Sequence, residues 1–443
     1  MRYDLVVIGG GIAGYTAAIK AAKLNKRVLL VEKNKIGGSY INHGSISAKT
    51  ILEISNELLK ICDLHEKGLD FLDVNIVESK VFEHCCKIEE DLRNNLVKEL
   101  EIEKVEVVLG EGKIITETAV EVAGKIFNTK KILIATGTKL NNLKTGGFKN
   151  AKSSEDFFKT GSIGEKIAII GGGVVGVEIA TFLMSIGKLV TIFEKEENLI
   201  SNFSRELSIQ LATTLKRKGV EILTNVQIHD ITSDYRVVFD VDGETTEKQF
   251  SDVIYSVGRI PNIKNLGLKE LGIEMDGDFI KVDEDYKTNI PSIYAVGDVV
   301  GKIPVAHFAE ISSEIAVSRM FKKGDYKNID VDLVPRCVYT TPEIAVIGKT
   351  EIAEDVKVVK YNMDQNGKAV VDGQSRGYIK LFAKNNYLIG AELYCTNATE
   401  IINEISLAIT NKIKIKEIVS TIHPQPTVCA SFKDACKMFL RRG

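Results

Sequence analysis

The stretch Asp4-Leu5-Val6-Val7-Ile8-Gly9-Gly10-Gly11-Ile12-Ala13-Gly14 decides the fold of this chain of 443 residues. Its first part is a short apolar run, which is typical of a strand buried on both faces of a sheet. Gly9 permits the tight turn after that strand, and Gly11 lets the backbone approach a pyrophosphate. Gly14 lets the following helix pack close to the strand, and the N-terminus of that helix attracts phosphates.

The residues after the glycines complete a nucleotide-binding unit. We expect an alanine-rich helix through Lys23, and residues 27–31 are predicted to form a second strand, which Glu32 ends. The carboxylate of Glu32 can accept hydrogen bonds from the hydroxyls of a ribose. The segment therefore predicts a Rossmann-like strand-turn-helix-strand unit that binds a dinucleotide.

The same arrangement recurs later in the chain. Residues 167–170 form an apolar run, Gly171-Gly172-Gly173-Val174-Val175-Gly176 follows it, and the run 190–193 ends at Glu194. In both units the acid follows the first glycine by 23 positions. One glycine motif can be an ordinary turn, but two complete units argue against that interpretation. We therefore expect two bound dinucleotides, or one dinucleotide and a second cofactor.

The acid that ends the second unit bears on the choice of nicotinamide cofactor. A carboxylate at Glu194 repels the 2′-phosphate of NADPH, so we expect NADH to be preferred. Its neighbour Lys195 acts in the opposite direction, because an ammonium group attracts that phosphate.

Length and composition limit the class of protein. A chain this long exceeds one hydrophobic core, so two to four domains are expected. With 44% apolar and 27% charged residues, the composition is that of an ordinary soluble globular protein. The net charge of −2 gives no reason to expect nucleic acid or an anionic membrane as a partner.

Cysteine usage and apolar stretches indicate a cytoplasmic location. Seven cysteines, an odd number, suit a reducing cytosol, and no Cys-x-x-Cys pair suggests a structural zinc site, so we expect no metal. No secretory signal is recognisable at the N-terminus. The most apolar stretch, 167–187, contains five glycines and Glu178, which argues against a membrane span.

Four further motifs carry a resemblance to a known family: Ile134-Ala135-Thr136-Gly137-Thr138, Val257-Gly258-Arg259-Ile260-Pro261-Asn262, Thr288-Asn289-Ile290-Pro291-Ser292-Ile293-Tyr294-Ala295-Val296-Gly297-Asp298-Val299 and Tyr339-Thr340-Thr341-Pro342-Glu343-Ile344-Ala345. With the two glycine units, they resemble the pyridine nucleotide–disulfide oxidoreductases, closest in pattern to dihydrolipoamide dehydrogenase. The resemblance runs from Met1 to about Ala435.

The resemblance implies an α/β fold with two Rossmann-like domains and a C-terminal α+β dimerisation domain. The FAD domain would be split between residues 1–147 and 271–322, with an inserted NAD(P) domain over 148–270. Residues 323–443 would form the dimerisation domain. The protein would be a homodimer whose active site is shared across the interface.

The resemblance also assigns the cofactors to residues. FAD would be held by Gly9, Gly11, Gly14, Glu32, Gly37, Gly38, Thr136, Gly137 and Asp298. In the family the aspartate at the place of Asp298 bonds the ribityl chain of FAD. The nicotinamide cofactor would be held by Gly171, Gly173, Gly176, Glu194 and Gly258.

Lys49 and Glu178 are the matches that bear on chemistry. In the family the lysine at this place pairs with the glutamate after the second glycine motif, close to flavin N5 and the nicotinamide. Each residue alone could be a solvated helix charge. Because both match at once, we expect a retained pair that tunes the flavin and orients the hydride donor.

The dithiol centre of the family is missing. The segment Ile36-Gly37-Gly38-Ser39-Tyr40-Ile41-Asn42-His43-Gly44-Ser45-Ile46-Ser47-Ala48-Lys49 resembles Gly-Gly-Thr-Cys-Leu-Asn-Val-Gly-Cys-Ile-Pro-Ser-Lys, with Tyr40 and Ser45 at the two redox cysteines. In His423-Pro424-Gln425-Pro426-Thr427-Val428-Cys429-Ala430, Gln425 and Ala430 stand at the family's acid–base histidine and its orienting glutamate. Neither residue type can carry out that proton transfer, and a serine hydroxyl cannot cycle to a disulfide.

Three functions stay open. The first is an FAD-dependent NAD(P)H oxidoreductase that reduces a non-disulfide acceptor, such as a quinone, a dye, oxygen, a metal or a second nicotinamide. Electrons would leave near Tyr40, Ser45 and Gln425 of the partner subunit, and His43 is either a proton donor there or a structural residue. The second is a retired homologue kept as a dimeric scaffold. The third is a disulfide reductase that uses Cys429 and Cys436.

Overall fold

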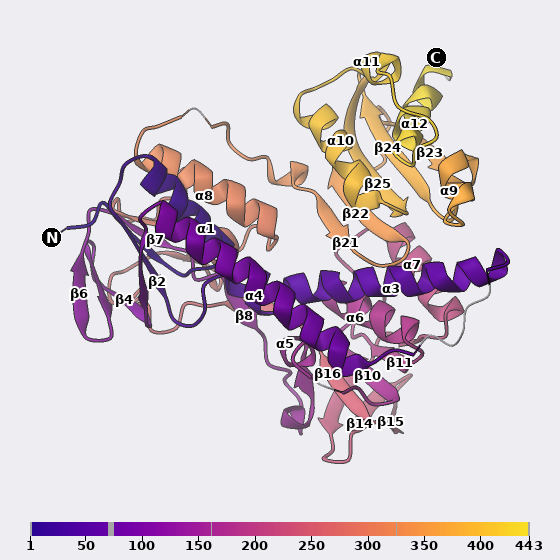
Figure 1. The fold of residues 1–443 in the computed structure, drawn as a ribbon, viewed down its shortest axis with the longest axis horizontal. Coiled ribbons are helices and arrows are strands. Elements are labelled where there is room, and N and C mark those ends of the chain that lie inside the picture. Colours follow the sequence, from indigo (N-terminus) through magenta and orange to yellow (C-terminus); the bar gives the residue numbers. More distant parts are fainter. Residues whose placement is uncertain (1, 70–74, 161, 325, 442–443) are drawn as a thin grey trace.

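Three lobes make up the chain in the computed structural model, which describes residues 2–69, 75–160, 162–324 and 326–441. Figure 1 shows the first nucleotide unit on the left, the second below the centre and the C-terminal lobe at the upper right. The expected α/β fold class, with two Rossmann-like units and a C-terminal α+β lobe, is confirmed. The three boundaries between the four predicted segments stay a prediction.

The first lobe is built on a parallel sheet with the strand order β20-β7-β1-β2-β3. Because β20 follows the whole second unit in sequence, the chain leaves this sheet after β7 and later returns to it. Helices α1 and α8 lie side by side on one face, and a small antiparallel sheet covers the other. The elements are β1 (Leu5–Ile8), α1 (Ile12–Lys23), β2 (Val28–Glu32), β3 (Glu106–Leu109), β4 (Gly112–Thr116), β5 (Ala119–Val122), β6 (Lys125–Asn128), β7 (Ile132–Ile134), β20 (Ile293–Ala295) and α8 (Ala306–Met320).

The second lobe repeats this plan in the parallel order β12-β11-β10-β16-β9. A three-stranded antiparallel sheet, β13-β14-β15, packs on it as its counterpart does in the first lobe. The elements are β9 (Lys152–Ser153), α5 (Ser154–Phe157), β10 (Lys166–Ile170), α6 (Val174–Ser185), β11 (Leu189–Phe193), α7 (Arg205–Arg217), β12 (Glu221–Leu223), β13 (Gln227–Ile231), β14 (Arg236–Val241), β15 (Glu244–Gln249) and β16 (Asp252–Tyr255).

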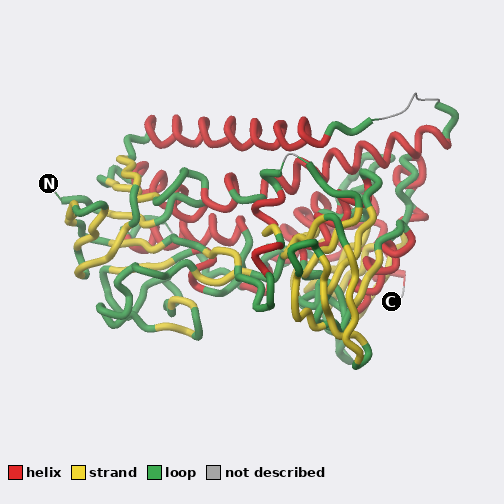
Figure 2. Tube along the Cα trace, turned by 90° about the horizontal axis from the view of Figure 1, so that it is seen from below, coloured by secondary structure: helices red, strands yellow, loops and turns green. Residues whose placement is uncertain are grey.

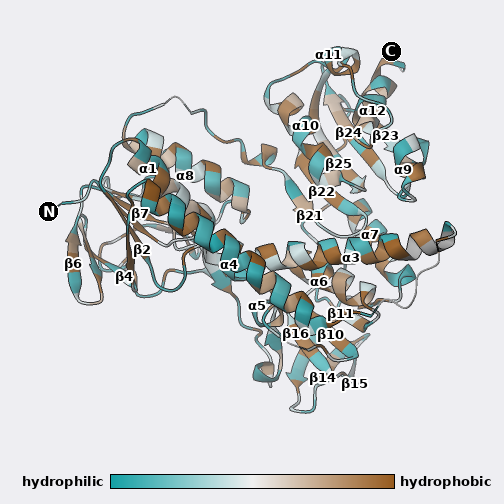
Figure 3. Cartoon of the chain, viewed as in Figure 1, coloured by the Kyte–Doolittle hydropathy of each residue, from teal (hydrophilic) through white to brown (hydrophobic). Residues whose placement is uncertain are grey.

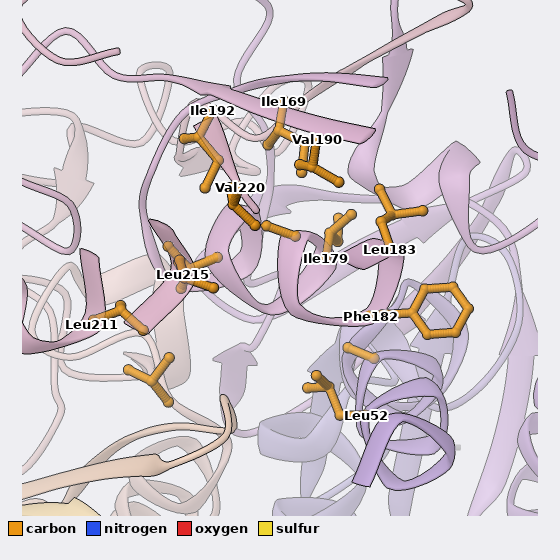
Figure 4. Close-up of a cluster of buried hydrophobic side chains, with 14 of the residues drawn as sticks. Leu52, Ile169, Ile179, Phe182, Leu183, Val190, Ile192, Leu211, Leu215 and Val220 are labelled. Atoms are coloured by element: carbon orange, nitrogen blue, oxygen red, sulfur yellow. The ribbon is translucent and has the colours of Figure 1, made fainter. Parts of the chain in front are cut away.

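One buried cluster joins the second sheet to the helices around it (Figure 4). Ile169 and Ile192 of the sheet, Ile179 of α6 and Leu215 of α7 are at most 2% exposed. The cluster also contains Leu52, which belongs to α3 (Ser45–Glu66) of the first lobe. This shared core fixes α3, which carries Lys49, against α6, which carries Glu178.

The C-terminal lobe is an antiparallel sheet with the order β21-β22-β25-β24-β23, packed with helices. It meets the second lobe through the same buried cluster, which includes Val338, Ile344 and Val346, and through polar contacts between α7 and the strands β23 and β24. The elements are β21 (Arg336–Val338), β22 (Glu343–Gly348), β23 (Lys357–Asn362), α9 (Gly367–Val371), β24 (Tyr378–Lys384), β25 (Tyr387–Cys395), α10 (Ala398–Thr410), α11 (Ile415–Ser420) and α12 (Ala430–Arg441).

Two hairpins form where the sequence carries a turn signal. Ala123-Gly124 joins β5 to β6, and Asp242-Gly243 joins β14 to β15. Both residues of each turn have positive φ, at 49° and 76° in the first and 52° and 84° in the second. Such two-residue turns match the twist of paired strands, which is why Asp-Gly predicts them well.

The long helix α4 (Glu78–Ile102) contacts the loop beside the first glycine turn. Figure 2 shows α4 along one edge of the molecule, and Figure 3 shows mainly hydrophilic residues along it. Arg93 of α4 donates a 2.6 Å hydrogen bond to the Asn42 side chain, which ends the short helix α2 (Gly38–Asn42). Within the described part of the chain, no helix is long and apolar enough to cross a membrane.

Candidate nucleotide and redox site

A cavity of about 520 Å³ lies between the two nucleotide units and is lined by residues of both. Most of the residues expected at the site line it: Gly9, Gly11, Glu32, Gly38, Tyr40, His43, Ser45, Lys49, Thr136, Gly137, Glu178, Gly258 and Asp298. Others lie behind its wall or outside it: Gly14, Gly37, Gly171, Gly173, Gly176, Glu194 and Gln425. The roles of these residues stay predictions, but the fold brings the larger group around one space.

Close backbone contacts explain the glycines at the two turns. A Cβ added to Gly14 would lie 1.7 Å from the carbonyl oxygen of Gly9, and one added to Gly176 would lie 1.9 Å from that of Gly171. A Cβ on Gly38 would meet the Cα of Gly11 at 2.5 Å. Larger residues would therefore separate each helix from its strand and close the approach to the turn.

The cavity wall also has polar groups that suit a dinucleotide. The hydroxyl oxygen of Thr136 is buried and has no hydrogen-bond partner in the described structure. Burial raises the pKa of the Asp298 carboxyl, while the Thr138 hydroxyl and the charge of Arg259 lower it. A buried hydroxyl without a partner is costly unless a bound group satisfies it. The wall therefore fits FAD in the first unit, with Asp298 and Thr136 as polar contacts.

The two acids that end the units are held in the same way. Gly10 donates its N–H to Glu32 Oε2 at 2.7 Å, and Gly172 donates to Glu194 Oε2 at 2.6 Å. The N–H two residues after each acid binds its other oxygen, at 2.8 Å in the first unit and 2.9 Å in the second. Carboxylate oxygens have further lone pairs, so each clamped acid can still accept a ribose hydroxyl.

Lys49 and Glu178 form an ion pair at the cavity wall. The ammonium of Lys49 lies 2.9 Å and 3.0 Å from the two carboxylate oxygens. Glu178 is only 2% exposed, while the Lys49 side chain is 36% exposed, so only the acid is buried.

Tyr339, in the turn after β21, completes this pair from the C-terminal lobe. Its backbone N–H donates to Glu178 Oε1 at 3.0 Å, and its ring centre lies 4.5 Å from the ammonium of Lys49. The sequence places Tyr339 in a family motif but does not predict it as a site residue. Its position in the motif that opens the C-terminal lobe is the sequence feature that could have indicated this role.

Arg259, in β17 (Arg259–Pro261), ties several segments of the wall together. It donates to the hydroxyl and the carbonyl of Thr138 at 2.9 Å and 3.0 Å, and to the Ser39 hydroxyl at 3.0 Å. The Thr138 hydroxyl in turn donates to Asp298 at 2.9 Å. A further nitrogen of Arg259 lies 3.1 Å from Glu155. The sequence places Arg259 in a family motif but does not predict its contacts, and no sequence pattern indicates Glu155 as a site residue.

His43 faces the free oxygen of Glu155. Its Nδ1 is buried and lies 3.3 Å from Glu155 Oε2, and the side chain as a whole is 33% exposed. Burial by itself raises the pKa of the Glu155 carboxyl, but His43 and Arg259 outweigh burial and lower it. Glu155 is therefore a carboxylate at neutral pH, shared between a guanidinium and an imidazole.

Hydroxyl groups lie in the part of the wall where the resemblance predicts the positions of the family's two redox cysteines. Tyr40 and Ser45 both line the cavity, and no cysteine is among the lining residues. Tyr40 also packs against the core of the first lobe, close to Tyr15, whose pKa burial raises.

The C-terminal segment lies away from the cavity of its own protomer. Gln425 is exposed, Ala430 is fully buried, and neither lines the cavity. Cys429 and Cys436 are free thiols, and burial raises the pKa of both. Within one protomer, neither thiol is placed to meet a cofactor in this cavity.

The fold and the site together define an oxidoreductase that uses two dinucleotides. Comparison with known proteins makes this class specific. The family model for pyridine nucleotide-disulphide oxidoreductases matches residues 3–313, and the model for the dimerisation domain of these enzymes matches residues 334–436. The chain therefore belongs to the pyridine nucleotide-disulphide oxidoreductases, which depend on FAD and NAD(P)H.

The curated relatives match over the full length. The chain is 31% identical to the dihydrolipoyl dehydrogenase of Mycoplasma pneumoniae, covering 99% of both chains. It is 32% identical to the dihydrolipoyl dehydrogenase of Bacillus subtilis, covering 96% of this chain and 94% of the relative.

Solved structures share the fold. LpdA from Mycobacterium tuberculosis superposes with a TM-score of 0.90 at 23% identity, covering 98% of this chain and 99% of that one. The HOCl-induced flavoprotein disulfide reductase RclA from Escherichia coli gives 0.88 at 24% identity, covering 98% of this chain and all of that one. The match to the dimerisation domain suggests a homodimer, as for the dihydrolipoyl dehydrogenases.

Proposed function

We propose that this protein is an FAD-dependent NADH oxidoreductase whose electron acceptor is not a disulfide. One observation carries the proposal: the shared cavity contains the Lys49–Glu178 pair but is lined by no cysteine. In our assignment Tyr40 and Ser45 take the positions of the two redox cysteines. Bound FAD would supply the chemistry, by accepting a hydride from NADH and passing the electrons on.

The chain's own residues would bind and orient the two cofactors. The glycine turn at Gly9 and the carboxylates of Glu32 and Asp298 would hold FAD. The buried hydroxyl of Thr136 would form a hydrogen bond with the bound FAD. The second glycine turn and Glu194 would hold the nicotinamide dinucleotide, and the charge of Glu194 favours NADH. Lys49, fixed by Glu178, would place one positive charge at the reacting end of the cavity.

The acceptor side would be completed by a second subunit. We infer that Gln425 of the partner subunit reaches the wall formed by Tyr40 and Ser45. An amide cannot act as an acid or a base at neutral pH, so the thiol chemistry of the family is not expected there.

The first test is anaerobic mixing of the FAD-loaded protein with NADH while the flavin spectrum is recorded. We expect rapid bleaching with about two electrons per FAD and no long-wavelength thiolate–flavin band. If neither NADH nor NADPH bleaches the flavin, the proposal is wrong and a binding or scaffold role replaces it.

A second test distinguishes the proposed function from a disulfide reductase that uses Cys429 and Cys436. Lipoamide is expected to give no turnover with NADH, while ferricyanide, a simple electron acceptor, is expected to be reduced. If lipoamide is reduced and the Cys429→Ser variant loses that activity, the disulfide chemistry resides in Cys429 and Cys436 instead.

A further inference from the structure

The wall beside Tyr40 and Ser45 contains an imidazole, that of His43, which can transfer a proton near neutral pH. We propose that His43 donates a proton to the electron acceptor, with Glu155 as its positioning residue, and that the acceptor is a quinone-type molecule. The inference rests on the proposed function and names the class of acceptor.

The carboxylate of Glu155 lies beside one edge of the His43 ring. Arg259 holds one oxygen of Glu155 at 3.1 Å, so the other oxygen faces Nδ1 of His43 at 3.3 Å. Nδ1 makes no hydrogen bond in the described structure, but a carboxylate 3.3 Å away attracts positive charge on the ring and so favours its protonated form. Because Nδ1 is buried while the side chain is a third exposed, the accessible part of the side chain lies elsewhere than at Nδ1.

Arg259 makes this arrangement rigid. Its other nitrogens are bonded to Ser39 and Thr138 at 2.9–3.0 Å, so it cannot turn away from Glu155 without losing them. Ser39 also belongs to the short helix that carries Tyr40. The proton donor and the proposed acceptor wall are thus held by one guanidinium.

The surrounding side chains suit a planar carbonyl compound. The aromatic face of Tyr40 can pack against a conjugated ring, and hydroxyl groups such as that of Ser45 can donate to carbonyl oxygens. A quinone takes up protons together with its electrons, so an imidazole in the wall can serve as its proton donor. A metal complex that accepts one electron needs no such donor.

The reaction balances with the groups named. NADH, one proton and a quinone give NAD⁺ and a hydroquinone. Two electrons and one proton originate as the hydride of NADH, and the second proton comes from His43. Solvent then reprotonates His43, which its exposed part allows. Ferricyanide takes up one electron and no proton, so its reduction does not require this donor.

The test compares a soluble benzoquinone with ferricyanide in the FAD-loaded His43→Gln variant. Gln keeps a polar side chain beside Glu155 but cannot donate a proton at neutral pH. We expect the ratio of quinone to ferricyanide kcat/KM to fall about 10²–10⁴-fold, as for loss of a general acid. His229→Gln is the matched control, because His229 lies on the exposed hairpin beside Asp240. An unchanged ratio overturns the role of His43.

The positioning role of Glu155 has its own readout. Glu155→Gln is expected to lower kcat for the quinone more than it raises KM, because the wall keeps its shape while the charge beside Nδ1 is lost. A change in KM alone would assign Glu155 to binding and contradict the positioning role.

A binding experiment needs no turnover. In protein labelled with ¹⁵N-histidine, the ring signal that His43→Gln removes identifies His43 among the six histidines. Benzohydroquinone added without oxygen is expected to shift that signal and to leave the His229 signal in place. No shift at His43 places the acceptor elsewhere and overturns the inference. Failure of the proposed function is seen separately, as flavin that NADH does not bleach.

Discussion

At the scale of single residues, Glu178 is a buried carboxylate in the cavity wall. It is 2% exposed and binds both the Lys49 ammonium and the N–H of Tyr339. We expect Glu178→Gln to slow flavin bleaching by NADH about tenfold or more, because losing a charged hydrogen-bond partner at a buried site costs about 1–3 kcal/mol. Anaerobic stopped-flow measures this rate. Glu247→Gln on the exposed hairpin is the control, and equal rates in both variants would exclude a role for the pair.

Glu194 is expected to set the choice between NADH and NADPH. Glu194→Gln keeps an acceptor for only one of the N–H groups of Gly172 and Glu196, which bind different carboxylate oxygens, and it removes the charge that repels a 2′-phosphate. We expect the ratio of kcat/KM for NADH over NADPH to fall at least about tenfold, which corresponds to about 1.4 kcal/mol. Glu197→Gln, an exposed neighbour paired with Arg205, tests whether any lost charge has this effect. A similar fall in that control would contradict the assignment.

Local patterns predicted some of these residues and could not predict others. Glu32 and Glu194 follow from the spacing after the glycines, because strand, turn and helix lengths are nearly fixed in such a unit. The contacts of Arg259 with Glu155 and Ser39 join positions 104 and 220 residues apart. No periodicity records such pairs, so only the folded chain brings His43 and Glu155 together.

At the scale of elements, the turn after β21 connects the C-terminal lobe to the ion pair. The Tyr339 ring lies over the Lys49 ammonium at 4.5 Å, and a cation–π contact is worth about 0.5–2 kcal/mol. We expect Tyr339→Leu to slow flavin bleaching by NADH severalfold and to change the flavin midpoint potential. Tyr339→Phe keeps the ring and should retain the parent values. If both variants behave alike, the ring has no part in placing Lys49.

The contact between α7 and the C-terminal sheet should depend on pH. Lys360 and Lys380 lie 2.5 Å and 2.8 Å from Glu206, and although burial raises the pKa of this carboxyl, the two lysines outweigh burial and lower it. A lowered pKa stabilises the fold above the ordinary value of 4.5 and loses that stabilisation as pH falls through the lowered value.

Glu206→Gln tests this contact. Since Glu206 is about a third exposed, we expect a loss of about 1 kcal/mol or less at pH 7 and a smaller loss at pH 3. Urea unfolding midpoints at the two pH values measure the difference. Glu274→Gln, which removes an exposed pair with Lys281, is the control. A loss that is equal at both pH values would mean that packing, and not charge, holds α7 to the sheet.

At the scale of the whole molecule, the three lobes follow from the sequence because each nucleotide unit is a local repeat with its own signals. The return of β20 to the first sheet came only from the family resemblance, since periodicity does not say which sheet a strand joins. The shared core of α3 and α6 is likewise a product of folding, and it places Lys49 against Glu178.

The assembly expected for this family requires a covered surface on the C-terminal lobe. Ile422 is 92% exposed and lies three residues before Gln425, and Leu407 on α10 is 60% exposed. Large exposed apolar side chains beside one loop are typical of a surface that a partner covers. We expect the 48.8 kDa chain to sediment as a dimer and Ile422→Glu to shift it towards the monomer, because the interface would bury an unpaired charge.

Loss of the dimer should affect reduction of the flavin by NADH and reduction of the acceptor differently. If Gln425 of the partner subunit completes the acceptor wall, the monomeric Ile422→Glu variant should still be bleached by NADH but should reduce a quinone more slowly. Ile126→Glu is the matched control, since Ile126 is 60% exposed on β6 of the first lobe. It should remain a dimer with parent activity. A monomer with full quinone turnover would show that one protomer contains the whole site, and that electrons leave along a wall that His43, Tyr40 and Ser45 complete by themselves.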